Sequence, residues 1–129
     1  MLSYQELVTR AIGVLPMAYA PYSRFSVGAA LQDTRGRVFL GCNVENASYG
    51  ATLCAERAAL AAAVAAGSRD FAALAVVSSG PGVCLPCGLC RQVLAEFTPG
   101  LTILCAEPNG AFQVYTLAEL LPHRFALRA

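Results

Sequence analysis

The chain has 129 residues and a formal net charge of +1, with 13% charged and 57% hydrophobic residues. Its nine basic residues are all arginines scattered along the chain, which excludes the clustered basic side chains that binding to a nucleic-acid backbone requires. Because an average domain is about 25% charged, so few charges leave little polar surface for an isolated monomer. We therefore expect one domain over residues 1–129 that buries surface against copies of itself.

The ends and the cysteines bear on where the protein works. Residues 1–6 contain no basic region followed by an apolar run, so no signal peptide is predicted. No apolar stretch reaches the length of about 18 residues that a membrane span needs. Without a secretion signal, the six cysteines are expected to be reduced thiols. These features predict a cytoplasmic protein with no membrane contact.

Hydrophobic periodicity predicts four helices and five strands. Pro16 is expected to kink or end the first helix, residues 32–36 to form a hairpin turn, and Thr116 to be the N-cap of the last helix. The polar loop of residues 43–51 suits a functional segment. In chain order, we expect a helix over 2–18, strands over 25–31 and 37–42, a helix over 53–66, a strand over 71–78, a helix over 87–97, strands over 101–106 and 111–115, and a helix over 117–121. This order predicts an α/β fold with helices on both faces of a mixed sheet.

Two cysteine motifs carry the chemistry of the sequence. Cys54 is followed two residues later by Glu56, and Cys87 and Cys90 form a P-C-x-x-C motif further along. Three thiolates can hold Zn²⁺ and leave a fourth position for water, as a catalytic zinc requires. A third cysteine with a glutamate two residues later is also the pattern of zinc-dependent deaminases of nucleobases. The spacing alone does not bring Glu56 to the metal, because residues two apart point to different sides of a helix.

Other readings of the cysteines stay open. Cys87 and Cys90 could form a redox pair, although Cys54 and Glu56 would then have no role. Cys84 could complete a closed, structural four-cysteine zinc site in a protein that binds or assembles without catalysis. The remaining thiols, Cys42 and Cys105, are interpreted as core residues. The single histidine, His123, is interpreted as a surface residue.

Nearly the whole chain resembles the small cytidine deaminases. The resemblance rests on F-S-V-G-A-A from Phe25, C-N-V-E-N-A-S-Y-G from Cys42, C-A-E-R from Cys54 and P-C-G-L-C-R-Q from Pro86. It implies a three-layer α/β/α sandwich with a mixed sheet of about five strands. It also implies one zinc ion per chain, held by Cys54, Cys87 and Cys90, and Glu56 as the general acid and base. The implied reaction converts cytidine and deoxycytidine to uridine and deoxyuridine plus ammonia, in pyrimidine salvage.

The resemblance also assigns the residues around the substrate. Asn43 and Glu45 would bind the ribose hydroxyls, and in an extended segment residues two apart do point to the same side. A turn-capping Asn and a solvated Glu are the alternatives. A homotetramer with shared active sites is implied, in which Tyr49 or Phe125 enters the site of a neighbour. The other assigned positions are an aromatic wall at Phe25, a substrate contact at Ala55, and arginines that hydrogen-bond to the thiolates at Arg57 and Arg91.

Two positions depart from the family pattern, and two rival substrates remain. The family commonly has Ser at position 85 and Pro at position 26, where this chain has Leu85 and Ser26. A blasticidin-type or other base deaminase is one rival, and the pair Asn43 and Glu45 argues instead for a substrate with a ribose. A polynucleotide deaminase would need a basic groove that the scattered arginines do not provide.

Overall fold

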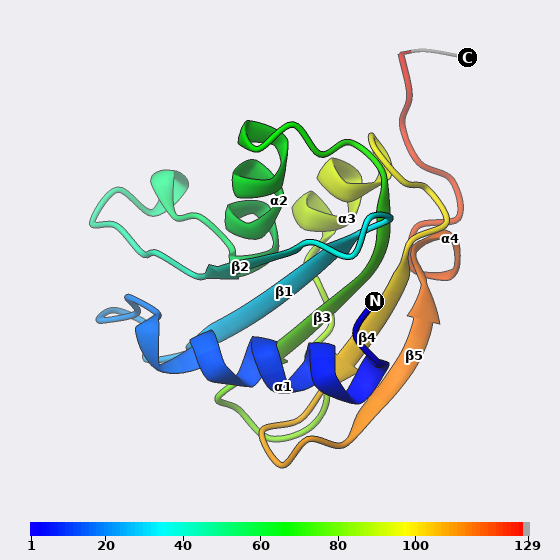
Figure 1. Ribbon diagram of the computed structural model, residues 1–129. Helices are drawn as coiled ribbons and strands as arrows, with labels where there is room; N and C mark the ends of the chain where they lie inside the picture. The colour runs from blue at the N-terminus through cyan, green and yellow to red at the C-terminus, as the bar shows by residue number, and fades with distance from the viewer. Residues whose placement is uncertain (128–129) are drawn as a thin grey trace.

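The computed structural model describes residues 1–127 and contains a five-stranded mixed sheet (Figure 1). The strand order is β2-β1-β3-β4-β5, in which β3 and β4 run parallel and the other neighbours antiparallel. In chain order the elements are α1 (Tyr4–Val14), a 3₁₀ turn (Leu15–Met17), β1 (Val27–Asp33), β2 (Val38–Cys42), a 3₁₀ turn (Tyr49–Ala51), α2 (Ala55–Ala65), β3 (Phe71–Ser78), α3 (Gly88–Ala95), β4 (Thr102–Ala106), β5 (Phe112–Thr116) and α4 (Leu117–Leu120).

Helices cover both faces of the sheet, which confirms the expected three-layer α/β/α architecture (Figure 1). Helix α1 packs on one face, where its Leu7, Val8 and Ala11 join alternate residues of the central strands. Helices α2 and α3 pack on the other face, in a second buried cluster. Because both faces of the central strand β3 are covered, seven of its eight residues are buried, as the continuous apolar run predicts. No helix within residues 1–127 has the length and hydrophobicity needed to cross a bilayer.

The expected element boundaries move where special backbone geometry occurs. The first helix ends at Val14 and continues as a 3₁₀ turn, because Pro16 has no N–H for an α-helical bond. The first strand starts at Val27 rather than at residue 25, since Arg24 has a left-handed backbone with a φ of 57°. The N-cap at Thr116 is confirmed, and its side chain accepts a hydrogen bond from the backbone of Glu119.

A glycine in β2 sets how closely α2 lies on the sheet. A Cβ atom at Gly41 would lie 2.5 Å from the backbone nitrogen of Ala59 and would also meet the carbonyl oxygen of Ala55. Both atoms belong to the backbone of α2, so no side-chain rotation could relieve the contact. The absence of a side chain at Gly41 therefore lets the first turns of α2 rest directly on β2, and this contact positions the start of the helix.

Candidate functional site

The first turns of α2 and α3 bring three thiols together. Cys54 and Cys87 are the N-cap residues of the two helices, and neither side chain is used in a capping hydrogen bond. Cys90 is the third residue of α3. The three sulfur atoms lie within 4.8 Å of one another, and the Sγ atoms of Cys54 and Cys87 are 3.9 Å apart. A tetrahedral zinc with Zn–S bonds of about 2.3 Å requires sulfur atoms about 3.8 Å apart, so the thiols fit this ion.

The surroundings favour the thiolate form at Cys54. Hydrogen bonds from Cys90, Arg57 and Cys87 outweigh the effect of burial and lower the pKa of Cys54 to about 5. The Nη2 atom of Arg57 lies 3.5 Å from the sulfur, as expected. The pKa of Cys90 is raised because its thiol hydrogen-bonds to Cys54 and is buried. Zinc with three thiolates carries a formal charge of −1, and the guanidinium of Arg57 offsets part of it.

The other cysteines lie outside this cluster. Cys84 is buried, and burial raises the pKa of its thiol to about 12. Within residues 1–127, the group of thiols close enough to share one ion contains only Cys54, Cys87 and Cys90. The closed four-cysteine alternative is therefore not supported. Cys105 is a core residue, as predicted, while Cys42 is half-buried at the end of β2.

A cavity of about 260 Å³ is lined by Cys54 and Cys87 of the thiol cluster, and Glu56 lies in its wall. Glu56 is 4% exposed, and burial, with a smaller contribution from the Cys54 thiolate, raises its pKa to about 7. Cys54 and Glu56 share the cavity although they are two residues apart. The reason is that Cys54 has an extended backbone before the helix begins, so helical side-chain directions do not apply to it. Ala55 lines the same cavity.

The expected sugar-binding residues lie along this cavity. Asn43 is 8% exposed, and its amide is held at both ends. Its Nδ2 donates to the carbonyl oxygen of Phe25, and its Oδ1 accepts from the backbone N–H of Val27, each at 2.8 Å. Phe25 is half exposed and lines the cavity with Glu45. The extended loop therefore brings Asn43 and Glu45 to one cavity, as their spacing predicts.

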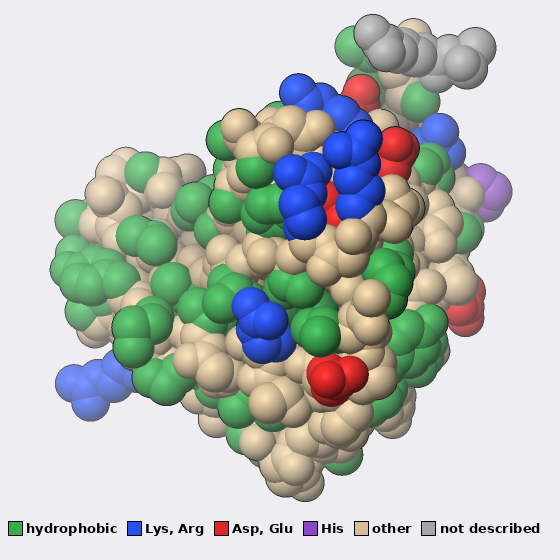
Figure 2. Space-filling model, viewed as in Figure 1, with side chains coloured by type: hydrophobic (Ala, Val, Ile, Leu, Met, Phe, Trp, Pro, Cys, Tyr) green, Lys and Arg blue, Asp and Glu red, His purple; other side chains and the backbone are tan. Residues whose placement is uncertain are grey.

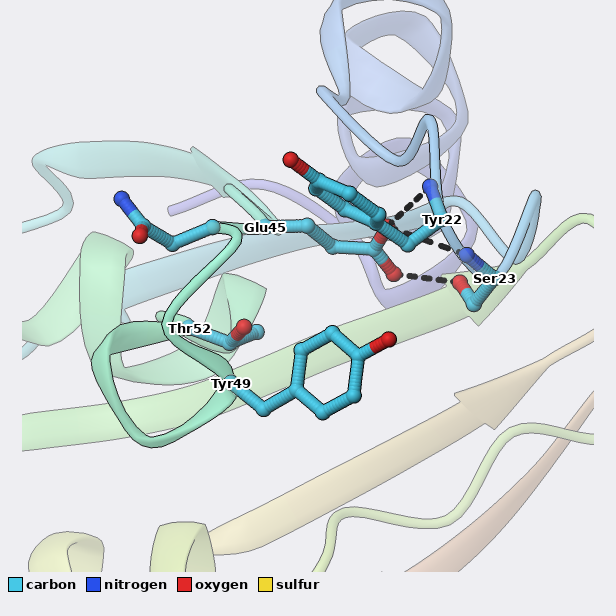
Figure 3. Close-up of a pocket in the computed structure, with 6 residues that line it drawn as sticks. Tyr22, Ser23, Glu45, Tyr49 and Thr52 are labelled. Carbon is cyan, nitrogen blue, oxygen red and sulfur yellow. Dashed lines mark hydrogen bonds between the residues drawn. The ribbon is translucent and has the colours of Figure 1, made fainter.

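A second cavity of about 390 Å³ adjoins the first (Figure 3). The rings of Tyr22 and Tyr49 lie edge to face across it, with centroids 6.1 Å apart. Ser23, Glu45 and Thr52 line both cavities, so the two form one continuous depression. Sequence reasoning missed Ser23 and Thr52. Ser23, two residues before Phe25, gave a weak signal, because Ser is common wherever the chain turns.

Two expected site residues have a different setting. Arg91 donates from Nε to the carbonyl oxygen of Pro86 and from Nη1 to that of Leu120, both at 2.8 Å, instead of bonding to a sulfur atom. It thereby holds the loop that precedes Cys87. Phe125 is 69% exposed and does not line the cavity that contains Glu56 in its own chain. Its carbonyl oxygen accepts a hydrogen bond from the side chain of Gln92.

Comparisons with known proteins agree with this geometry. Residues 1–113 match the family model of the cytidine and deoxycytidylate deaminase zinc-binding region. The cytidine deaminase of Halalkalibacterium halodurans is 49% identical over 122 residues, which cover 94% of this chain and 92% of that protein. A crystal structure of cytidine deaminase from Burkholderia pseudomallei superposes with a TM-score of 0.92 at 48% identity, covering 96% of this chain and all of that one. The Mycobacterium tuberculosis cytidine deaminase structure gives a TM-score of 0.85 at 43% identity, with coverage of 98% and 100%.

Proposed function

The chain belongs to the family of cytidine and deoxycytidylate deaminases, and from this premise we propose how its own residues deaminate cytidine. The reaction is hydrolytic, so cytidine and water give uridine and ammonia. The observation that carries the assignment is one cavity whose wall contains the buried carboxylate of Glu56 together with Cys54 and Cys87, two members of the cluster of three thiols. A purely structural zinc site has no need of a buried glutamate and an open cavity.

Cys54, Cys87 and Cys90 hold the zinc ion. When bound, zinc supplies a Lewis acid that makes water nucleophilic near neutral pH. Glu56 accepts the proton of the attacking water and donates it to N3 of the pyrimidine while the C4–O bond forms. It then carries the second proton to the amino group as the C4–N bond breaks. One carboxylate suits both transfers because it lies in the wall of the cavity and is shielded from bulk water.

The rest of the cavity binds the nucleoside. Asn43 keeps one N–H and one lone pair after its two internal hydrogen bonds, so it can bond to a sugar hydroxyl. Glu45 accepts a hydrogen bond from a sugar hydroxyl. Phe25 supplies an apolar wall for the sugar and base, and Ala55 supplies backbone groups beside the ring. The same contacts serve deoxycytidine with one hydroxyl fewer.

The proposed substrate is a free nucleoside rather than a polynucleotide. A cavity of about 260 Å³ is near the lower limit for a small-molecule site. On the face drawn in Figure 2, the basic side chains occur as one group and separate spots instead of a continuous stripe. Binding to a nucleic-acid strand needs a basic groove that follows the phosphates.

The function is tested by incubating zinc-loaded protein with cytidine and following the loss of cytosine absorbance together with ammonia release. Glu56→Gln should keep its fold and zinc but lose about 10²–10⁴-fold in turnover. Glu96→Gln is the matched control, because Glu96 is exposed and lies outside this cavity. No turnover of cytidine by the wild-type protein would reject the activity, and near-normal turnover by Glu56→Gln would reject the role of Glu56.

We further propose a homotetramer in which Phe125 or Tyr49 completes the site of a neighbouring chain. Both side chains are exposed, at 69% and 76% respectively, and such exposed aromatic rings favour an interface. Refolding Glu56→Gln chains together with Phe125→Ala chains should restore part of the activity, because some mixed sites receive both intact residues. A monomer in sedimentation at the assay concentration would reject the assembly. Three further expectations stay predictions: that residues 1–129 form one catalytic domain, that the protein is cytoplasmic, and that it acts in pyrimidine salvage.

A further inference from the structure

The carboxylate of Glu45 is held by a single turn of the chain that is distant in sequence. The backbone N–H groups of Tyr22 and Ser23 donate to its Oε1 atom at 2.9 and 3.1 Å. The hydroxyl of Ser23 bonds to the other oxygen, Oε2. Figure 3 shows the three bonds converging on the carboxylate, and Glu45 lines both cavities. Glu45 is therefore oriented before any ligand arrives.

The direction of the Ser23 hydrogen bond follows from the charge on its partner. The hydroxyl of Ser23, followed by the backbone N–H groups, holds the pKa of Glu45 below its usual range against the opposing effect of burial. An ionised carboxylate only accepts hydrogen bonds, so the Ser23 hydroxyl must donate its one proton to Glu45. The Oγ atom of Ser23 also accepts a hydrogen bond from the backbone N–H of Phe25 at 3.0 Å. Ser23 therefore has no proton left to offer a ligand.

Counting acceptor sites on Glu45 shows what it can bind. A carboxylate offers about four lone-pair sites. Two sites on Oε1 and one on Oε2 are taken by Tyr22 and Ser23. The site that remains on Oε2 accepts one further hydrogen bond. A sugar hydroxyl can fill it, whereas an anionic group that only accepts hydrogen bonds cannot. The orientation of this last site depends on the Ser23 hydroxyl, which fixes the same oxygen atom.

The hydroxyl of Ser23 also accepts a hydrogen bond across Arg24, a residue with an unfavourable backbone conformation. Arg24 has a φ of 57°, a left-handed geometry that residues with a Cβ atom rarely adopt. Its neighbour Phe25 is tied back to Ser23 across it, and the carbonyl oxygen of Phe25 accepts from Asn43. One chain of hydrogen bonds thus links Glu45, Ser23, Phe25 and Asn43. The two residues proposed to bind the sugar are held in register by this chain.

We propose that Ser23 is a positioning residue for recognition of the ribose. Its hydroxyl orients the free acceptor site of Glu45 towards a sugar hydroxyl, and it donates no hydrogen bond to the substrate itself. The inference rests on the proposed function, since it assigns Glu45 to the sugar. It predicts that Ser23 governs discrimination between nucleosides with and without sugar hydroxyls. It also predicts that Ser23 has little influence on the chemical step, because the hydroxyl lies in the sugar-binding part of the site and has no role in the proton transfers of Glu56.

The test compares cytidine with 2′,3′-dideoxycytidine, which lacks both ribose hydroxyls. In zinc-loaded protein, Ser23→Ala should raise the KM for cytidine about tenfold, as expected for a misaimed bond to a charged group, and leave kcat nearly unchanged. The KM for dideoxycytidine should change much less. Ser23→Thr keeps the hydroxyl and should restore much of the affinity for cytidine. Ser26→Ala is the matched control, because the described residues give the Ser26 side chain no hydrogen bond.

A second measurement separates this inference from the proposed activity. Calorimetric binding of both nucleosides is repeated in the Glu56→Gln background, where turnover does not interfere. Tighter binding of cytidine than of dideoxycytidine, lost on adding Ser23→Ala, supports the role even if the wild-type protein proves inactive. Equal losses for both nucleosides, or no preference for cytidine at all, overturn it. In Glu45→Gln protein, a further Ser23→Ala change should cost cytidine binding no more than it costs dideoxycytidine binding.

Discussion

The close packing of α2 against β2 at Gly41 offers a direct test of how the fold positions the metal-binding thiols. In Gly41→Ala, the added Cβ would lie 2.5 Å from the backbone nitrogen of Ala59 and 3.1 Å from the Cβ of Ala58. The backbone of Gly41 does not have a positive φ, so alanine tolerates its conformation and only the contact is perturbed. Reaching an ordinary separation of about 3.5 Å requires the start of α2 to lift by about 1 Å. That segment carries Cys54.

The expected magnitude follows from overpacking a buried contact. Inserting one methyl group into a tightly packed region costs about 1–3 kcal/mol, which corresponds to a melting temperature roughly 3–15 °C lower for a chain of this size. The metal site should respond as well. Structural zinc–ligand distances tolerate changes of only about 0.2 Å, so a shift of Cys54 relative to Cys87 and Cys90 should weaken zinc binding by about 10–100-fold, as changes in the surroundings of metal ligands do.

Thermal unfolding at one fixed protein concentration measures the first effect, and competition with a chromophoric chelator measures the second. Gly13→Ala is the matched control, because a Cβ at Gly13 meets nothing within 4 Å and alanine favours the helix by about 0.5–1 kcal/mol. The two variants should therefore shift the melting temperature in opposite directions. Equal melting temperatures and equal zinc affinities in Gly41→Ala and wild-type protein would refute the reasoning from close contact.

Three further predictions concern acid stability, the core and the metal. Hydrogen bonds, of which that from the Arg37 backbone N–H is the strongest, outweigh the effect of burial and hold the pKa of Asp33 at about 2. The pKa is about 3.9 in the unfolded chain. The contribution of Asp33 to the free energy of unfolding is therefore complete above pH ~4 and is lost as the pH falls towards 2. Denaturant unfolding should lose stability more steeply over this range than in Asp33→Asn, and parallel curves would contradict this. The Nε2 atom of Gln32 is buried with no partner among the described residues, so Gln32→Met should raise the free energy of unfolding by about 1–2 kcal/mol, whereas a lower midpoint would mean that the amide is satisfied. Cys84→Ser should retain one zinc per chain in metal analysis, and loss of the metal would revive the four-cysteine site.

Local sequence signals predicted most of the fold. The apolar run of residues 71–78 coincides with β3 (Phe71–Ser78), because a strand covered on both faces leaves a continuous hydrophobic pattern. The N-cap at Thr116 was also predictable, since the capping pattern lies within four residues. The start of β1 was not. Arg24 adopts a left-handed backbone that favours glycine, so nothing in its identity marks the turn that excludes Phe25 and Ser26 from the strand.

The candidate site divides in the same way between local and distant signals. The pairs Cys87 with Cys90 and Asn43 with Glu45 could be found because spacing along a short segment encodes a common direction, whereas Cys54 was joined to the other thiols by the pattern of zinc-dependent deaminases. Ser23 could not, because its significance depends on Glu45, 22 residues away, and no spacing rule connects a turn with a distant loop. The interpretation of Arg91 as a thiolate partner followed adjacency to Cys90, but the side chain extends back to Pro86 and towards α4.

The placement of Glu56 shows why a motif can encode more than helical geometry allows. Within a helix, residues two apart diverge, and a helix starting before Cys54 would separate the ligand from the carboxylate. The helix instead begins at Ala55, with Cys54 as an extended N-cap. The N-cap side chain normally turns towards the backbone N–H groups of the first turn, the same turn that contains Glu56. Because a thiol is a poor substitute for a capping oxygen, the sulfur stays free to bind a metal. The carboxyl of Glu56 lies in the cavity wall, where burial raises its pKa to about 7. The C-A-E sequence is thus compact because the helix boundary falls inside it.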